Sequence, residues 1–130
     1  MQSKQEKLLY EYAVVRYVPR VEREEFINIG LVMLCKRKKW VRWQITLPLV
    51  KITAFDCAFD TDTLTNQLAA MEGIAKGERL YGEIASLPAE ERFRWLTAVK
   101  SACIQTSRPH PGLTLDLDST FDRIYREQVL

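Results

Sequence analysis

The chain of 130 residues is long enough for one domain with a buried core, and 47% of its residues are hydrophobic. Its formal net charge of +2 gives no general electrostatic attraction for nucleic acid. No apolar run approaches the roughly 18 residues of a membrane-spanning helix, and the charged start MQSKQEKLL does not resemble a signal peptide, so we expect a cytoplasmic protein.

The cysteines and the single histidine do not indicate a metal centre. Cys35, Cys57 and Cys103 are far apart and lack C-x-x-C spacing, so they are expected to be reduced thiols. The aspartates within residues 56–62 and 116–122 do not follow the spacing of a calcium-binding loop. The sequence also lacks a glycine-rich phosphate loop and a paired-carboxylate motif, and it predicts no metal and no cofactor.

The first half of the chain predicts an antiparallel meander. Residues 1–8 are a polar lead-in that we expect to be flexible. Alternating Tyr and Val residues before Pro19 are typical of a strand, and the apolar segment around Gly30 indicates a central strand covered on both faces. A glycine inside a strand often marks a bulge or a close backbone approach. The three predicted strands cover residues 10–18, 26–36 and 40–47.

The middle of the chain predicts an irregular crossing and a helix. Residues 48–60 are interpreted as the crossing, with Phe55 and Phe59 as anchors in the core. Asp60 or Asp62 is expected to cap the helix that follows. The apolar positions of this helix, before a terminating Gly77, are Leu64, Leu68, Met71 and Ala75.

The last third predicts two more helices and one more strand. A helix is expected over residues 88–97, a strand over 102–106 and a rigid loop over 109–112. Ser119 and Asp122 have the spacing of a capping box for the final helix. The apolar stripe of this helix consists of Phe121, Ile124, Tyr125 and Val129. Together these elements predict one α+β domain over residues 1–130, with an antiparallel sheet of three to four strands and about three helices packed on one face.

Four segments carry a family resemblance. They are YAVVRYVP (12–19), REEFINIG (23–30), ERFRWLT (91–97) and SRPHPG (107–112). With these segments the chain resembles the bacterial DUF3037 family, whose function is unknown, from about residue 9 to the C-terminus.

The resemblance has one departure and one functional implication. Members often carry Pro-Arg-Ser after the third segment, where this chain has Val99, Lys100 and Ser101. Lysine keeps the charge but lacks the two-pronged geometry of arginine, so a bidentate anion contact at this point is in doubt. Members are often encoded beside kinase-like proteins resembling the HipA group, which implies an accessory role beside such a partner.

The polar residues around the first two strands allow two interpretations. They can form a salt-bridged connection at the end of the sheet, with the histidine capping a backbone carbonyl. Alternatively they surround an anion or phosphate ligand, because arginine offers a fixed fork of donors and histidine can transfer protons. A guanidinium at Arg16 that shares a face with Tyr12 and Val14 must be paired or must face a cleft. The candidate ligand-binding residues are Arg16, Arg23, Asn28, Arg94, Lys100, Ser101 and His110.

The basic turn after the second strand also allows two interpretations. Basic groups interleaved with aromatic rings can bind single-stranded nucleic acid, whereas exposed lysines at a hairpin turn also protect a sheet edge. The near-neutral net charge favours the second interpretation. The candidate nucleic-acid residues are Lys36, Arg37, Lys38, Lys39, Trp40 and Arg42.

Because no catalytic set is recognisable, the sequence favours a non-catalytic interaction module that binds a protein partner, with a HipA-like kinase as the partner that the resemblance suggests. A small anion-binding protein or enzyme built around Arg16, Asn28 and His110 is the alternative. Nucleic-acid binding through residues 36–43 is a weaker one, and oligomerisation stays open.

Overall fold

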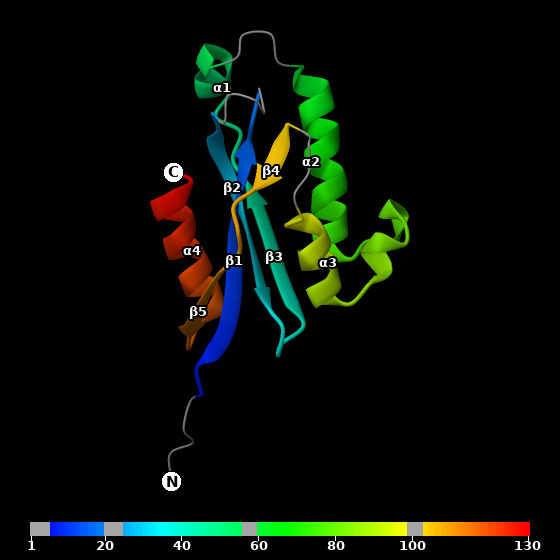
Figure 1. The fold of residues 1–130 in the computed structure, drawn as a ribbon, viewed down its shortest axis with the longest axis vertical. Helices are drawn as coiled ribbons and strands as arrows, with labels where there is room; N and C mark the ends of the chain where they lie inside the picture. Colours follow the sequence, from blue (N-terminus) through cyan, green and yellow to red (C-terminus); the bar gives the residue numbers. More distant parts are fainter. Residues whose placement is uncertain (1–5, 20–24, 56–59, 99–102) are drawn as a thin grey trace.

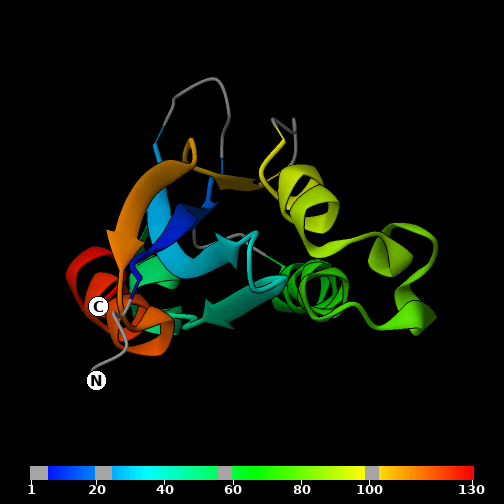
Figure 2. The same ribbon diagram turned by 90° about the horizontal axis from the view of Figure 1, so that it is seen from below.

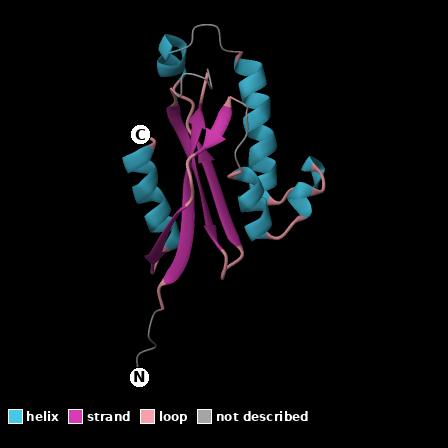
Figure 3. Ribbon diagram, viewed as in Figure 1, coloured by secondary structure: helices cyan, strands magenta, loops and turns pink. Residues whose placement is uncertain are grey.

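The computed structural model describes residues 6–19, 25–55, 60–98 and 103–130, with the backbone alone described at residues 53–55. These residues form five strands, four α-helices and two short 3₁₀ turns, which Figure 3 distinguishes by colour. In chain order they are β1 (Leu8–Tyr17), β2 (Ile27–Cys35), β3 (Trp40–Ile45), α1 (Leu49–Phe55), α2 (Thr61–Lys76), η2 (Arg79–Tyr81), η3 (Ile84–Ser86), α3 (Ala89–Leu96), β4 (Ile104–Thr106), β5 (His110–Thr114) and α4 (Leu117–Gln128).

The described strands form one antiparallel sheet in the order β3-β2-β1-β4, and β5 also pairs with β1. The α+β class predicted from the sequence is confirmed, but the sheet has one strand more than the three to four expected. The extra strand is β5, where a rigid loop over 109–112 was predicted. Because β5 lies at the sheet edge, Pro111 can occupy it without breaking a backbone hydrogen bond to the neighbouring strand.

The helices cover both faces of the sheet, whereas the sequence predicted them on one face. Figure 1 shows α2 and α3 on one side of the strands and α4 on the other. Ala13 and Val15 of β1 pack in the α2–α3 core, while Tyr10 and Val14 pack in a second core beneath α4. The prediction of a single covered face was wrong because alternate residues of β1 and β2 are apolar on both sides, so each face requires its own layer.

A bulge in β2 places two polar residues opposite each other. Val15 pairs with Gly30, but the next residue of β1, Arg16, pairs with Asn28, so Ile29 is the extra residue. A Cβ atom at position 30 would clash with the side chain of Ile45 and would lie 2.5 Å from the carbonyl oxygen of Gln44 on β3. The glycine therefore permits a close approach of β3, and a bulge lies beside it; the sequence had suggested one or the other at this position.

Local signals account for most helix boundaries. The side chain of Asp60 accepts hydrogen bonds from the backbone N–H groups of Asp62 and Thr63 at the start of α2, and Gly77 ends the helix with a φ of 72°. Residues 49–55 form the short helix α1 in the segment that was expected to be irregular. The side chains of Phe55 and Phe59 lie outside the described residues, so their anchoring role is not seen.

The final helix begins earlier than predicted. Asp116 is its N-cap and accepts a hydrogen bond from the backbone N–H of Ser119 at 3.1 Å, so the predicted capping box at Ser119 and Asp122 was wrong. The predicted stripe is confirmed: Phe121, Ile124 and Tyr125 are buried, and Val129 packs beside them. None of the described helices is both long enough and apolar enough to span a membrane.

Candidate functional site

An open pocket of ≈ 510 Å³ lies where the last turn of α4 meets the start of β2. It is lined by Phe26, Ile27, Asn28, Lys51, Gln128, Val129 and Leu130. The side-chain Nδ2 of Asn28 donates a hydrogen bond of 2.9 Å to the carbonyl oxygen of Gln128, so it fixes the end of α4 on the sheet. The guanidinium of Arg16 lies 4.0 Å from the centre of the Phe26 ring, a cation–π distance.

Arg16 and Asn28 each contribute a buried polar atom at this end of the sheet. Neither Arg16 Nε nor Asn28 Oδ1 has a hydrogen-bond partner among the described residues. Burial lowers the pKa of the Arg16 guanidinium, because desolvation disfavours its charged form. Both atoms are closed off from solvent, so a ligand in the pocket does not reach them unless the covering side chains move.

The predicted ligand-binding residues do not converge on one cleft. Arg94 lies on the opposite face, where its guanidinium donates two hydrogen bonds to the carboxylate of Glu11, one of them at 2.8 Å. This carboxylate raises the pKa of Arg94. The exposed His110 contacts Tyr12 in a tilted arrangement, with the ring centres 5.3 Å apart. Tyr12 is its strand partner, four residues from Arg16, which corresponds to roughly 13 Å along the strand.

The structure therefore brings together Arg16 and Asn28, but neither Arg94 nor His110 joins them. Arg23, Lys100 and Ser101 lie outside the described residues. Within the described ranges, no group of three His, Cys, Asp or Glu side chains is placed to hold a metal ion. Cys35 and Cys103 are free thiols, and Cys57 is not among the described residues.

The basic turn is exposed, and two of its residues form ion pairs. Lys36 Nζ lies 3.1 Å from a carboxylate oxygen of Glu90, and Arg37 lies 2.9 Å from one of Glu6. Lys38 and Lys39 are exposed, and Lys39 has a φ of 51°, typical of a tight turn. Trp40 is partly buried against the core beneath α4.

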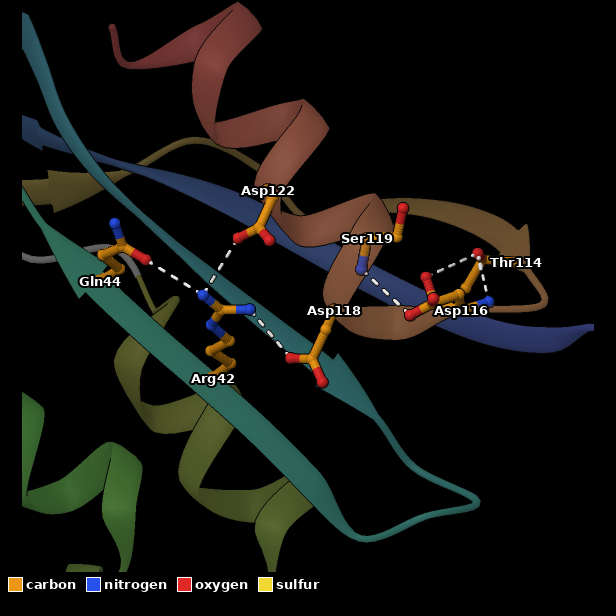
Figure 4. A network of polar contacts seen from close by, with 7 residues as sticks. All are labelled: Arg42, Gln44, Thr114, Asp116, Asp118, Ser119 and Asp122. Carbon is orange, nitrogen blue, oxygen red and sulfur yellow. Dashed lines mark hydrogen bonds and ion pairs between the residues drawn. The ribbon is translucent and has the colours of Figure 1, made fainter.

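Arg42 faces α4 instead of solvent and connects β3 to that helix (Figure 4). Its guanidinium lies 2.9 Å from Asp118 and 3.1 Å from Asp122, and it is 4.1 Å from the centre of the Phe121 ring. A further hydrogen bond of 3.3 Å joins it to Gln44. This network was not predicted from the sequence, although the i, i+4 spacing of the two aspartates places both on one side of the helix.

A second surface, absent from the sequence predictions, lies at the other end of the sheet. Leu9 of β1 and Leu113 of β5 are strand partners, and they are 61% and 62% exposed. They lie on the face opposite Tyr10, which packs beneath α4. Pro111, also exposed, is the strand partner of Glu11. The ion pair of Glu11 with Arg94 of α3 marks the limit to which α3 covers this face of the sheet.

We call Leu9, Pro111 and Leu113 the β1–β5 patch. Figure 1 shows the start of β1 extending below the start of α3, which explains why α3 does not cover this patch. The period-two alternation of β1 would have placed Leu9 on this face, but only the pairing with β5 puts Leu113 beside it.

Comparison with known proteins identifies the family. A family model described as a protein of unknown function, DUF3037, matches residues 12–129. The chain belongs to the DUF3037 family. No curated protein and no solved structure matches it. Of the segments that carried the resemblance, residues 12–17 lie in β1 and residues 27–30 in β2, the two central strands of this DUF3037 sheet. Residues 91–96 lie in α3, and residues 110–112 start β5.

Proposed function

We propose that this DUF3037 domain is a non-catalytic interaction module that binds a protein partner through the β1–β5 patch. The observation that carries the proposal is the pair Leu9 and Leu113, two large apolar side chains adjacent on a sheet face and more than half exposed. Contiguous exposed apolar groups beside charged residues are typical of protein-binding surfaces. Complete burial of each leucine against a partner would contribute about 1–2 kcal/mol.

The geometry of the patch fits a partner surface better than a small ligand. The two leucines and Pro111 lie on a sheet face and are exposed, whereas small-ligand sites are concave and enclose most of the ligand. The ion pair of Arg94 with Glu11 would lie at the rim, where charged groups set orientation more than affinity.

The family resemblance suggests which partner to test first. A kinase-like protein resembling the HipA group, encoded beside the gene in the native bacterium, is the first choice. The proposal thus includes a HipA-like kinase as the partner and the cytoplasm as the place where the two proteins meet.

The test is co-purification of the chain with this neighbour, followed by size-exclusion chromatography at micromolar concentration. We expect a complex with the wild-type chain and its loss with Leu113→Glu, which places a charge in the patch. Leu80→Glu is the matched control, because Leu80 is 89% exposed on η2, away from the patch, and this variant should bind normally. A chain that stays alone beside the neighbour, or a complex that tolerates Leu113→Glu, would contradict the proposal.

A further inference from the structure

The two edges of the sheet differ in how well they are protected. One edge is formed by β4 and β5, and Pro111 in β5 removes a backbone donor there. The other edge is β3, which pairs with β2 on one side and with no further strand in the described part of the chain. Figure 2 shows β3 at the border of the sheet. Residues 40–45 contain no proline and pair with β2 without a register shift.

We propose that this free edge of β3 binds an extended segment of a partner polypeptide as an added strand. The inference is independent of the β1–β5 patch, because β1 and β2 separate β5 from β3 by about 14 Å in total. The edge of β3 is therefore a second binding surface, and its occupant is an extended strand.

The backbone of β3 has the hydrogen-bonding pattern that an added strand requires. The N–H of Thr46, the residue after β3, donates to the carbonyl oxygen of Ile29 at 2.8 Å, so even-numbered residues direct their backbone groups toward β2. The N–H and C=O groups of Val41, Trp43 and Ile45 consequently point away from β2, outward from the open edge of the sheet. Such a repeating row of donors and acceptors is complementary to another extended backbone.

A pocket beside the edge provides a place for side chains of the added strand. It has a volume of ≈ 320 Å³ and lies between β3 and α2, where Trp43, Ile45, Leu68 and Ala69 line it. Trp43 and Ile45 are also two of the three residues whose backbone groups face outward. A strand paired with them would therefore direct every second side chain toward this mainly apolar pocket.

The chemistry of the pocket defines the class of peptide. Its apolar lining favours Val, Ile or Phe at the positions that face α2, whereas the intervening residues point to the opposite face and can be polar. Glu72 also lines the pocket, which disfavours an acidic side chain at these positions.

The test uses amide hydrogen exchange with a panel of acetylated and amidated seven-residue peptides that alternate Thr with Val, Ile or Phe. In the free protein we expect the amides of Val41, Trp43 and Ile45 to exchange rapidly and that of Thr46 to be protected. At least one peptide should slow the exchange of all three. The same peptide with N-methyl groups on alternate amides should lose this effect, because it keeps its side chains but cannot pair.

Two protein variants make the result specific. Val41→Pro removes an outward N–H without removing a bond to β2, and it should weaken binding about tenfold, as the loss of one or two hydrogen bonds implies. Ala69→Phe should weaken binding by filling the pocket, which keeps a test available should the proline variant fold poorly. Leu113→Glu should not change binding of the peptide. A failure of strand addition at β3 can therefore be distinguished from a failure of partner binding at the β1–β5 patch.

Three results would overturn the inference. One is that no peptide protects these amides. Another is protection that N-methylation does not remove. The third is protection of all three amides in the free protein together with a dimer in sedimentation, because a second copy of the chain would then occupy the edge.

Discussion

Replacement of Arg42 by methionine is expected to loosen α4 from the sheet. The side chain of Arg42 is 31% exposed and has two carboxylate partners, Asp118 and Asp122, whose side chains are 73% and 57% exposed. An ion pair with such exposed partners contributes about 0.2–1 kcal/mol. The stacking on Phe121 at 4.1 Å contributes about 0.5–1 kcal/mol more.

The sum predicts a loss of about 1–3 kcal/mol in the free energy of unfolding for Arg42→Met. For a domain of this size the melting temperature would fall by roughly 3–10 °C. Urea unfolding at low salt and at high salt separates the contributions, because salt screens the ion pairs and leaves most of the ring contact. The difference in the free energy of unfolding between wild type and Arg42→Met should therefore be smaller at high salt than at low salt, but it should not reach zero.

Two further variants control this experiment. Arg42→Lys keeps the charge but loses the planar fork that reaches both aspartates, so an intermediate stability is expected. Asp118→Ala should cost less in the Arg42→Met background than alone, because the partner is already missing. If Arg42→Met is as stable as wild type at low salt, the network does not hold α4 and the reasoning fails.

Three other predictions concern single residues. Arg16→Met should raise the free energy of unfolding by up to about 2 kcal/mol, because it removes a buried donor that has no hydrogen-bond partner among the described residues, although it also removes the contact with Phe26. A variant less stable in urea than the wild type would refute this. Gly112→Ala should lower the free energy of unfolding by about 1–3 kcal/mol, because the new methyl group would clash with the Tyr10 ring. An unchanged melting temperature would contradict this packing. Hydrogen bonds from Thr63 lower the pKa of Asp60 below its ordinary 3.8, so the stability this carboxylate adds is present above that pH and is lost as pH falls through the folded-state pKa. The difference between wild type and Asp60→Ala should accordingly shrink below pH 3.8, whereas a constant difference would contradict the assignment.

Local signals in the sequence determined much of the secondary structure. The alternation of Tyr and Val predicted β1, and the caps Asp60 and Gly77 bounded α2, because such signals act within a few residues of each other. The apolar run of β2 predicted a strand covered on both faces, which is its position in the sheet. The resemblance to DUF3037 rested instead on the segments 12–19, 23–30, 91–97 and 107–112, and the family match confirmed it.

The candidate site was predictable only in part. Arg16 and Asn28 were both named from the sequence, and the bulge at Ile29 does place them opposite each other. The separation of Arg94 and His110 from them could not be predicted, because it depends on which face α3 covers and on the pairing of β5 with the start of β1.

What the sequence alone determined about this protein is therefore four of the five described strands, the ends of α2 and α3, and its family. Only the tertiary structure decided the face on which α4 packs, the exposed pair of Leu9 and Leu113, and the free edge of β3. Those features depend on contacts between segments that are far apart in the chain. The hydrogen bond of Asn28 to Gln128, for example, joins residues 100 positions apart. Propensities and spacings act between neighbours along the chain, whereas the choice of a face, a strand partner or an open edge depends on how distant segments bury their apolar sides together.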